Sequence, residues 1–172
     1  TRHLQFSLPS RALYSQALRK GTATRLIDAL AVLLVRLHLA GFWWGDVSLS
    51  NTLFRRDAGA LAAYLVDAET GELHAQLSDG QRGHDLAIAE ENMVGELLDV
   101  EAELNEAQHF VPEDTARELV ERYERLWAEL TQEEAFGEDE RYRIHERLRR
   151  LNELGFDVEE VELVAAEAVA GG

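Results

Sequence analysis

The chain has 172 residues, a formal net charge of −16 at pH 7 and no cysteine. Its length and its 46% hydrophobic content suit one globular domain with its own core. The acidic balance argues against nucleic acid as a partner, because phosphate binding needs a basic surface. The absence of cysteine excludes disulfides and thiolate metal sites.

No transmembrane segment and no secretory signal is visible in the sequence. The longest apolar run, at residues 29–35, ends at Arg36 and is too short to span a bilayer. We therefore expect a cytoplasmic protein without a transmembrane segment.

The first predicted elements are two helices, at residues 10–20 and 22–40. Thr22 suits the N-cap of the second helix, and Gly41 suits its end. Apolar residues cover more than one face of this helix, which predicts that it is buried. These residues are Leu26, Ile27, Leu30, Leu33, Leu34 and Leu37.

Short strands follow the second helix. The sequence predicts strands at residues 52–54 and 62–66, a turn at 69–71 and a short return strand near 72–77. The polar residues 78–81 predict a loop.

Helices dominate the rest of the chain. Apolar residues at helical spacing predict a long helix from His84 to about Gln108 and another that begins at Pro112. A last helix is predicted at residues 138–154, closed by Gly155, and partial alternation predicts a terminal strand at 156–164. The expected fold class is α+β, mostly helical, with a few short strands.

Candidate catalytic residues follow the second predicted helix. Asp46 and Asn51 are separated by four residues, and Asp67 stands at the end of the later apolar strand. A carboxylate can orient an attacking hydroxyl, and carboxylate and amide oxygens can hold Mg²⁺ on phosphates. The pattern therefore predicts phosphoryl transfer, with Asp46 as the catalytic residue and Asn51 and Asp67 as metal ligands.

The segment from His38 to Asn51 resembles the His-Gly-Asp-x-x-x-x-Asn loop of bacterial small-molecule and sugar kinases. That group includes the aminoglycoside phosphotransferases and the lipopolysaccharide kinases, which have the protein-kinase-like fold. The chain also resembles domain-of-unknown-function family 4032, a bacterial group described as lipopolysaccharide-kinase-like. This wider likeness rests on residues 1–9, 24–30 and 151–157.

The resemblance implies the large, C-terminal lobe of a kinase-like protein as a single domain. Residues 1–9 would be a hinge remnant, 41–77 the catalytic loop and metal-site strands, and 82–164 the helical C-terminal part. No Gly-rich turn and no strand Lys precede Asp46, so we expect the N-terminal lobe to be absent.

The hinge remnant would carry the cofactor contacts. The resemblance implies that adenine of ATP touches the first four residues, Thr1, Arg2, His3 and Leu4.

Departures from the kinase pattern bear on the substrate. Gly45 stands where protein kinases carry Arg, and Asp67-Ala68-Glu69 replaces Asp-Phe-Gly. The chain therefore lacks the Arg that pairs with an activation-loop phosphate and the Phe-based switch. These departures favour a small-molecule or glycan hydroxyl as the acceptor over a regulated protein kinase.

Asp85 matches the Asp-Leu-Ala start of the corresponding helix in aminoglycoside-phosphotransferase-like kinases. In that superfamily an acid here accepts hydrogen bonds from the catalytic-loop backbone, so the resemblance implies a structural anchor. The alternative is a helix cap, which a side-chain oxygen also provides. Two further choices concern residues near the catalytic loop. Trp43 and Trp44 either stack on a substrate or pack in the core. Glu69 either approaches the metal or is a turn acid.

The expected function is transfer of the γ-phosphoryl group of ATP to a hydroxyl of a small molecule or glycan, with Mg²⁺ and ATP as cofactors. We expect the full-length parent to perform it and this fragment to be inactive alone. The alternative is a pseudokinase, a kinase-shaped binding module whose partner contacts the acidic helices. A homodimer through the surface left by the missing lobe is a further expectation.

Overall fold

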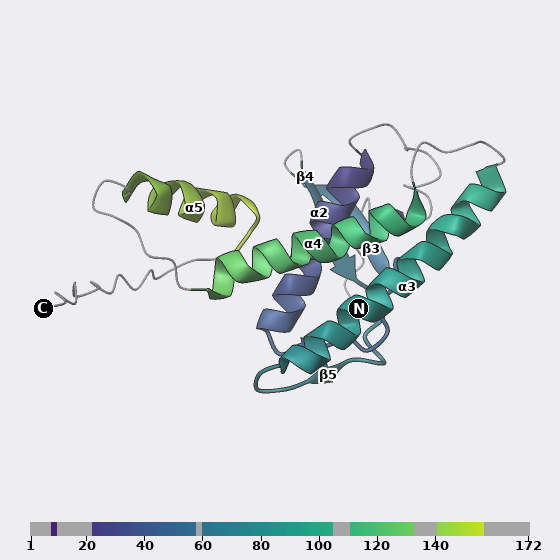
Figure 1. Cartoon of the computed structure of the whole chain (residues 1–172), viewed down its shortest axis with the longest axis horizontal. Helices are drawn as coiled ribbons and strands as arrows, with labels where there is room; N and C mark the ends of the chain where they lie inside the picture. The colour runs from purple at the N-terminus through teal and green to yellow at the C-terminus, as the bar shows by residue number, and fades with distance from the viewer. Residues whose placement is uncertain (1–7, 10–21, 58–59, 105–110, 133–140, 157–172) are drawn as a thin grey trace, which may run out of the picture. The chain divides into compact units, whose positions relative to one another are not determined.

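The computed structural model describes residues 8–9, 22–57, 60–104, 111–132 and 141–156 (Figure 1). The chain forms two compact units, Thr1–Leu130 and Thr131–Gly172. The described part is α+β and mostly helical, as the sequence predicts. The helix expected at residues 10–20 lies outside the described residues, as does nearly all of the strand expected at 156–164.

The strands form two small antiparallel sheets. The larger sheet has the order β1-β3-β4, built from Leu8–Pro9, Thr52–Asp57 and Ala60–Leu65. The smaller sheet pairs β2, Phe42–Trp43, with β5, Glu72–Leu73. The predicted strands are therefore present, with β3 longer and β5 shorter than the sequence indicates.

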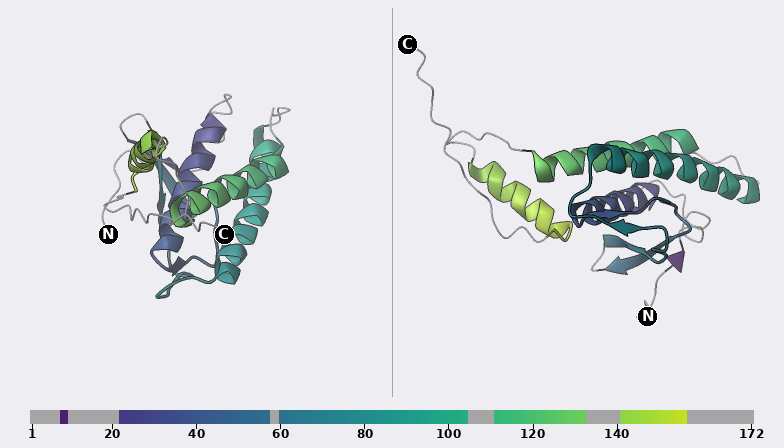
Figure 2. Two further views of the ribbon diagram at one scale, coloured as in Figure 1. Left: turned by 60° about the vertical axis from the view of Figure 1, so that its left-hand side comes forward. Right: turned by 90° about the horizontal axis from the view of Figure 1, so that it is seen from below.

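Helix α2, Thr22–Leu39, is the predicted buried helix. Leu26, Ile27, Leu34 and Val35 are each at most 1% exposed. The helix packs along β4, and the right-hand view of Figure 2 places it between the strands on one side and helices α3 and α4 on the other. Burial on both sides explains why its apolar residues are not confined to one stripe.

Helix α3, Asp79–Leu104, begins five residues before the predicted start at His84. The prediction of a loop at 78–81 was wrong, because Ser78 and Gln81 form a capping box. Ser78 Oγ accepts the Gln81 N–H at 3.2 Å, and Gln81 Oε1 accepts the Ser78 N–H at 3.0 Å. These reciprocal bonds satisfy backbone donors at the helix start.

Helix α4, Pro112–Thr131, begins at the predicted proline and buries the predicted apolar face, including Ala116, Leu119 and Tyr123. Among the described helices none combines the length and apolar character needed to cross a bilayer.

Helix α5, Arg141–Glu153, belongs to the second unit and ends at the predicted glycine. Gly155 has a φ of 80°. The Gly155 N–H bonds the Asn152 carbonyl at 2.9 Å, and the Phe156 N–H bonds the Leu151 carbonyl at 3.0 Å. This pair of bonds is a Schellman motif, which needs a left-handed residue at the Gly155 position.

Candidate functional site

The predicted catalytic loop, residues 44–51, begins at a backbone position that favours glycine. Gly45 has a φ of 77°, a left-handed conformation that side chains with a Cβ rarely adopt. Trp44 is fully buried, with 0% of its surface exposed, so it packs in the core and is not available to stack on a substrate. Trp43 is half-buried and meets His84 edge to face, with 5.5 Å between the ring centroids.

Asp85 holds the start of this loop. Its Oδ2 accepts the Trp44 N–H at 2.8 Å, and its Oδ1 accepts the Gly45 N–H at 2.8 Å. These are the donors that the anchor hypothesis expects. Asp85 lies in the second turn of α3, and Ser78 caps that helix, so the alternative role of Asp85 as the cap is excluded by its position.

A buried chain of hydrogen bonds connects Asp85 to two further core residues. His38 Nε2 lies 3.0 Å from Asp85 Oδ2, and His38 Nδ1 lies 2.7 Å from the Tyr123 hydroxyl. A carboxylate only accepts, so we assign the His38 proton to Nε2, which leaves Nδ1 to accept the Tyr123 hydroxyl proton. The three residues join α2, α3 and α4 at one point in the core.

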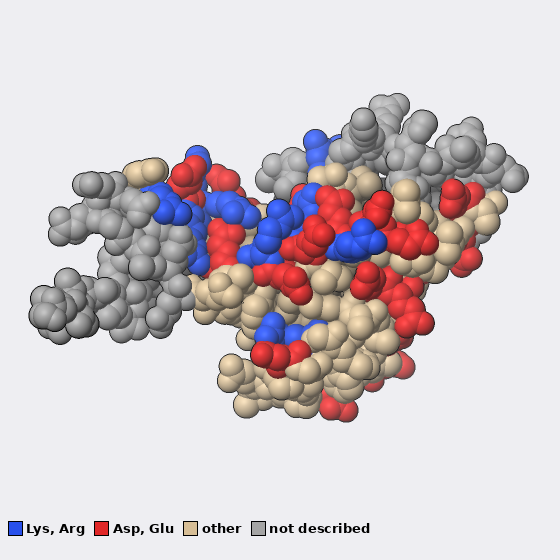
Figure 3. Space-filling model, viewed as in Figure 1, with Lys and Arg blue, Asp and Glu red and all other residues tan. Residues whose placement is uncertain are grey.

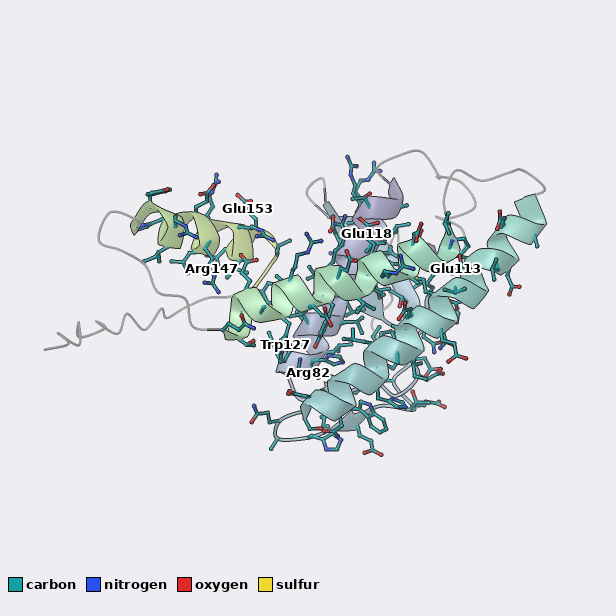
Figure 4. The ribbon with its side chains drawn as sticks, in the orientation of Figure 1. Arg82, Glu113, Glu118, Trp127, Arg147 and Glu153 are labelled. Atoms are coloured by element: carbon teal, nitrogen blue, oxygen red, sulfur yellow. The ribbon has the colours of Figure 1, made fainter. Side chains whose placement is uncertain are left out.

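Arg82 continues this chain to the surface of α4. Burial lowers the pKa of Arg82, but its bonds to Tyr123 and Asp79 outweigh that effect and raise the pKa above its ordinary value. Its guanidinium carbon lies 4.0 Å from the ring centroid of Trp127. Figure 4 shows these two side chains directed toward one another from α3 and α4. Such cation–π contacts are worth about 0.5–2 kcal/mol.

Two further residues of α3 hold the loop, and neither was singled out from the sequence. Asn92 Nδ2 donates to the Val47 carbonyl at 2.9 Å and lies 3.5 Å from Asp46 Oδ1. Glu96 Oε2 accepts the Leu49 N–H at 2.8 Å, and Glu96 Oε1 accepts the Ser50 N–H at 3.0 Å.

A sequence signal for these residues existed. Asp85, Asn92 and Glu96 are spaced by seven and four positions, which places them on one stripe of a helix. The buried residues Ala89, Met93 and Leu97 lie beside that stripe. Polar residues that line the edge of a buried face indicate hydrogen bonds to a neighbouring segment.

The predicted metal ligands lie at one end of the β3–β4 hairpin. Thr52 pairs with Leu65, and the Val66 N–H bonds the Asn51 carbonyl at 3.1 Å. Asn51 and Asp67 therefore flank the last paired positions of two adjacent strands. Asp67 is exposed, and its Oδ1 accepts the Glu69 N–H at 3.1 Å.

A second contact ties the Asp67 segment to the start of the loop. Thr70 Oγ1 donates to the Trp44 carbonyl at 3.0 Å. Glu69 and Thr70 form a turn closed by a bond of 3.0 Å from the Gly71 N–H to the Ala68 carbonyl. The turn location of Glu69 agrees with its interpretation as a turn acid.

Residues 125–171 match the family model described as Domain of unknown function (DUF4032). The match confirms the family resemblance over this C-terminal part of the chain. Comparison with curated proteins found no match.

The DUF4032 match begins within α4, whose exposed side carries charges of both signs. Arg117 pairs with Asp114 at 2.9 Å, and Arg122 pairs with Glu118 and with Asp28 of α2. Figure 3 shows acidic and basic side chains interspersed over this helix on the face in view. Mixed charge of this kind is typical of a solvated face.

The donors at the hairpin end have the chemistry that Mg²⁺ prefers, because carboxylate and amide oxygens are hard ligands. Among the described residues no three His, Cys, Asp or Glu side chains group closely enough to form a metal cage. Mg²⁺ commonly binds through one or two carboxylates together with substrate phosphates. Asn51 and Asp67 offer one amide oxygen and one carboxylate, which are ligand types of that mode. The predicted ATP contacts Thr1, Arg2, His3 and Leu4 lie outside the described residues.

Proposed function

We propose that this chain is the large lobe of a kinase-like phosphotransferase that moves the γ-phosphoryl group of ATP to a hydroxyl of a small molecule or glycan. The observation that carries the proposal is the Thr52–Leu65 pairing, which brings Asn51 and Asp67 to one end of the hairpin. The Asp85 bonds to Trp44 and Gly45 add support, since they fix the backbone directly before Asp46.

In this proposal Asp46 orients the attacking hydroxyl of the acceptor. Its side chain is exposed, and Asn92 lies beside it. An exposed carboxylate can reach an acceptor that arrives from solvent, and hydrogen bonding within the 44–51 loop limits its movement.

Asn51 and Asp67 would hold Mg²⁺ on the nucleotide phosphates. When bound, the ion would supply charge neutralisation to the transferred phosphoryl group. The two side chains supply the ligands from adjacent strands, so the hairpin register sets their spacing. Use of ATP suits a cytoplasmic location, which is part of the proposal.

The alternative is a pseudokinase that uses the same fold to bind a partner through its acidic helices. The net charge of −16 favours this alternative, because it opposes an ATP anion. An active enzyme requires a Gly-rich turn and a strand Lys from the segment that completes the site. A pseudokinase is expected to have lost them.

The proposal is tested by adding Mn²⁺ to the labelled chain and following NMR line broadening. We expect selective broadening of the Asn51 side-chain amide and of the Asp67 backbone amide, at millimolar metal, and loss of both effects in Asp67→Ala. Asp99→Ala, which removes an exposed acid from α3, is the matched control and should leave the broadening intact. Equal broadening in Asp67→Ala and in the unaltered chain contradicts the metal site.

Calorimetric titration with Mg-ATP provides a second test, of nucleotide binding. We expect no binding below millimolar concentration for this chain alone, because two ligands and a loop supply only part of a nucleotide site. Phosphate release above that of Asp67→Ala would show instead that this chain is sufficient for turnover.

A further inference from the structure

The carboxylate of Glu96 receives two consecutive backbone N–H groups. Oε2 accepts from Leu49 at 2.8 Å and Oε1 accepts from Ser50 at 3.0 Å. Glu96 is partly buried on α3, 46 and 47 positions from these partners in the chain. Charge-assisted bonds of this length are among the stronger hydrogen bonds in proteins.

The next two N–H groups have local acceptors. The Asn51 N–H bonds Ser48 Oγ at 3.3 Å, and the Thr52 N–H bonds the Leu49 carbonyl at 3.1 Å. Four successive backbone donors, at 49–52, are therefore all satisfied. The turn supplies the acceptors for the last two, and Glu96 supplies the acceptors for the first two.

The position of Glu96 gives these bonds a specific consequence. The Leu49 and Ser50 N–H groups belong to the two peptide units that precede the Ser50–Asn51 peptide, so their orientation helps to set the direction from which the Asn51 side chain leaves the backbone. Asp85 holds the loop at Trp44 and Gly45, at its opposite end. Glu96 therefore ties the segment directly before Asn51 to α3, in addition to the local turn bonds of that segment.

We propose that Glu96 is a positioning residue for Asn51, acting through the Leu49 and Ser50 N–H groups to present the Asn51 amide oxygen to the metal. This inference rests on the proposed function, because it assigns Asn51 as a ligand. Both Glu96 oxygens are directed at backbone donors, so Glu96 acts on the backbone and is not itself counted among the ligands.

The test uses Glu96→Gln in the full chain. Glutamine keeps the size of the side chain but has one oxygen, so it can accept only one of the two N–H groups with comparable geometry. We expect hydrogen exchange of the Leu49 or Ser50 amide to accelerate by roughly tenfold or more. We also expect Mn²⁺ broadening of the Asn51 side chain to fall at least twofold while broadening at Asp67 persists.

Glu91→Gln is the matched control. It removes the same charge from the same helix at an exposed position, about 140° around the helix from Glu96 given 3.6 residues per turn. It should change neither reading. Glu96→Asp, which keeps the charge but shortens the side chain by one methylene, should resemble Glu96→Gln if reach to the two N–H groups is what matters.

The outcomes separate this inference from the proposed function. Broadening of Asn51 that is unchanged in Glu96→Gln, despite faster amide exchange, overturns the positioning role and leaves the metal site intact. Unchanged hydrogen exchange of the Leu49 and Ser50 amides in both Glu96 variants also overturns the positioning role, because it shows that Glu96 does not hold these two N–H groups. Absence of Asn51 broadening in the unaltered chain overturns the metal site and the positioning role together. The first two outcomes overturn the positioning role only.

Discussion

His38 Nε2 and Asp85 Oδ2 lie 3.0 Å apart in the core, and both side chains are fully buried. The Asp85 side chain is tolerated there because its oxygens accept three bonds, from His38 and from the Trp44 and Gly45 N–H groups. One buried acid thus serves a helix and the 44–51 loop at the same time.

Asp85→Ala is expected to destabilise the fold strongly. The substitution leaves two buried donors and the partly buried Gly45 N–H without their acceptor, and breaking a buried pair costs about 3–5 kcal/mol. Urea unfolding followed by circular dichroism measures the loss. Asp99→Ala, an exposed acid on the same helix, should change the free energy of unfolding by no more than about 0.5 kcal/mol. Similar values for the two variants would exclude the anchor role.

Ionisation of Tyr123 should lower the free energy of unfolding in alkali. Burial raises the pKa of Tyr123 to about 12 from its ordinary 10.0. The contribution of the neutral Tyr123 hydroxyl to the free energy of unfolding is therefore fully present below pH 10. It is lost as the pH rises toward 12, and the loss is on the order of 2 kcal/mol. Unfolding measured between pH 9 and pH 12 should show this slope, which Tyr123→Phe should reduce. The exposed Tyr142 gives the control, since Tyr142→Phe should leave the slope unchanged.

Gly41→Ala should be strongly destabilising. Gly41 has a φ of 76°, and an added Cβ would lie 2.1 Å from the backbone oxygen of His74. A backbone atom cannot rotate away, so the clash adds to a left-handed penalty of about 1–2 kcal/mol. The drop in melting temperature should be among the largest of any single glycine substitution in the first unit.

Gly95→Ala is expected to have the opposite effect on stability. An added Cβ at Gly95 in α3 meets nothing within 4 Å, so the helix gains about 0.5–1 kcal/mol from reduced backbone entropy. A higher melting temperature for Gly95→Ala together with a lower one for Gly41→Ala is the expected pair of results. Destabilisation by both would show that the α3 backbone differs from a regular helix at Gly95.

Ser78→Ala should fray the start of α3. Its hydroxyl accepts the Gln81 N–H at 3.2 Å, and loss of such a cap costs about 1 kcal/mol. Ser78→Asp should restore most of the stability, because a carboxylate caps equally well and also favours the helix dipole. Hydrogen exchange at residues 79–82 reports the change locally. Equal exchange in Ser78→Ala and Ser78→Asp would contradict the capping role.

The sequence predicted elements whose signals are local. Helix α2 has a dense apolar pattern between Thr22 and Gly41, and the β3–β4 hairpin follows from short apolar runs in its two strands. The start of α3 was missed because Gly80 and Gly83 suggest a loop, whereas the reciprocal Ser78–Gln81 bonds outweigh their low helix propensity.

The candidate site was predicted only in part, for a physical reason. Asp46, Asn51 and Asp67 were proposed as site residues from their spacing along the chain, and their catalytic and metal-binding roles stay predictions. Glu96 and its N–H partners are nearly fifty positions apart, so no local pattern specifies that contact. His38 was noted only as the start of the kinase-like segment, because its partner Tyr123 is 85 positions away and no local pattern links the two.

The three α3 side chains grip the loop mainly by main-chain atoms: the N–H groups of Trp44, Gly45, Leu49 and Ser50 and the carbonyl of Val47. Every residue type except proline carries the same main-chain N–H and C=O groups. The exposed Ser50 is therefore the loop residue whose side chain can be exchanged with least effect on the course of the loop, whereas the Ser48 hydroxyl accepts the Asn51 N–H. A loop held in this way keeps the backbone that carries Asp46 and Asn51 in place when its exposed side chains are changed.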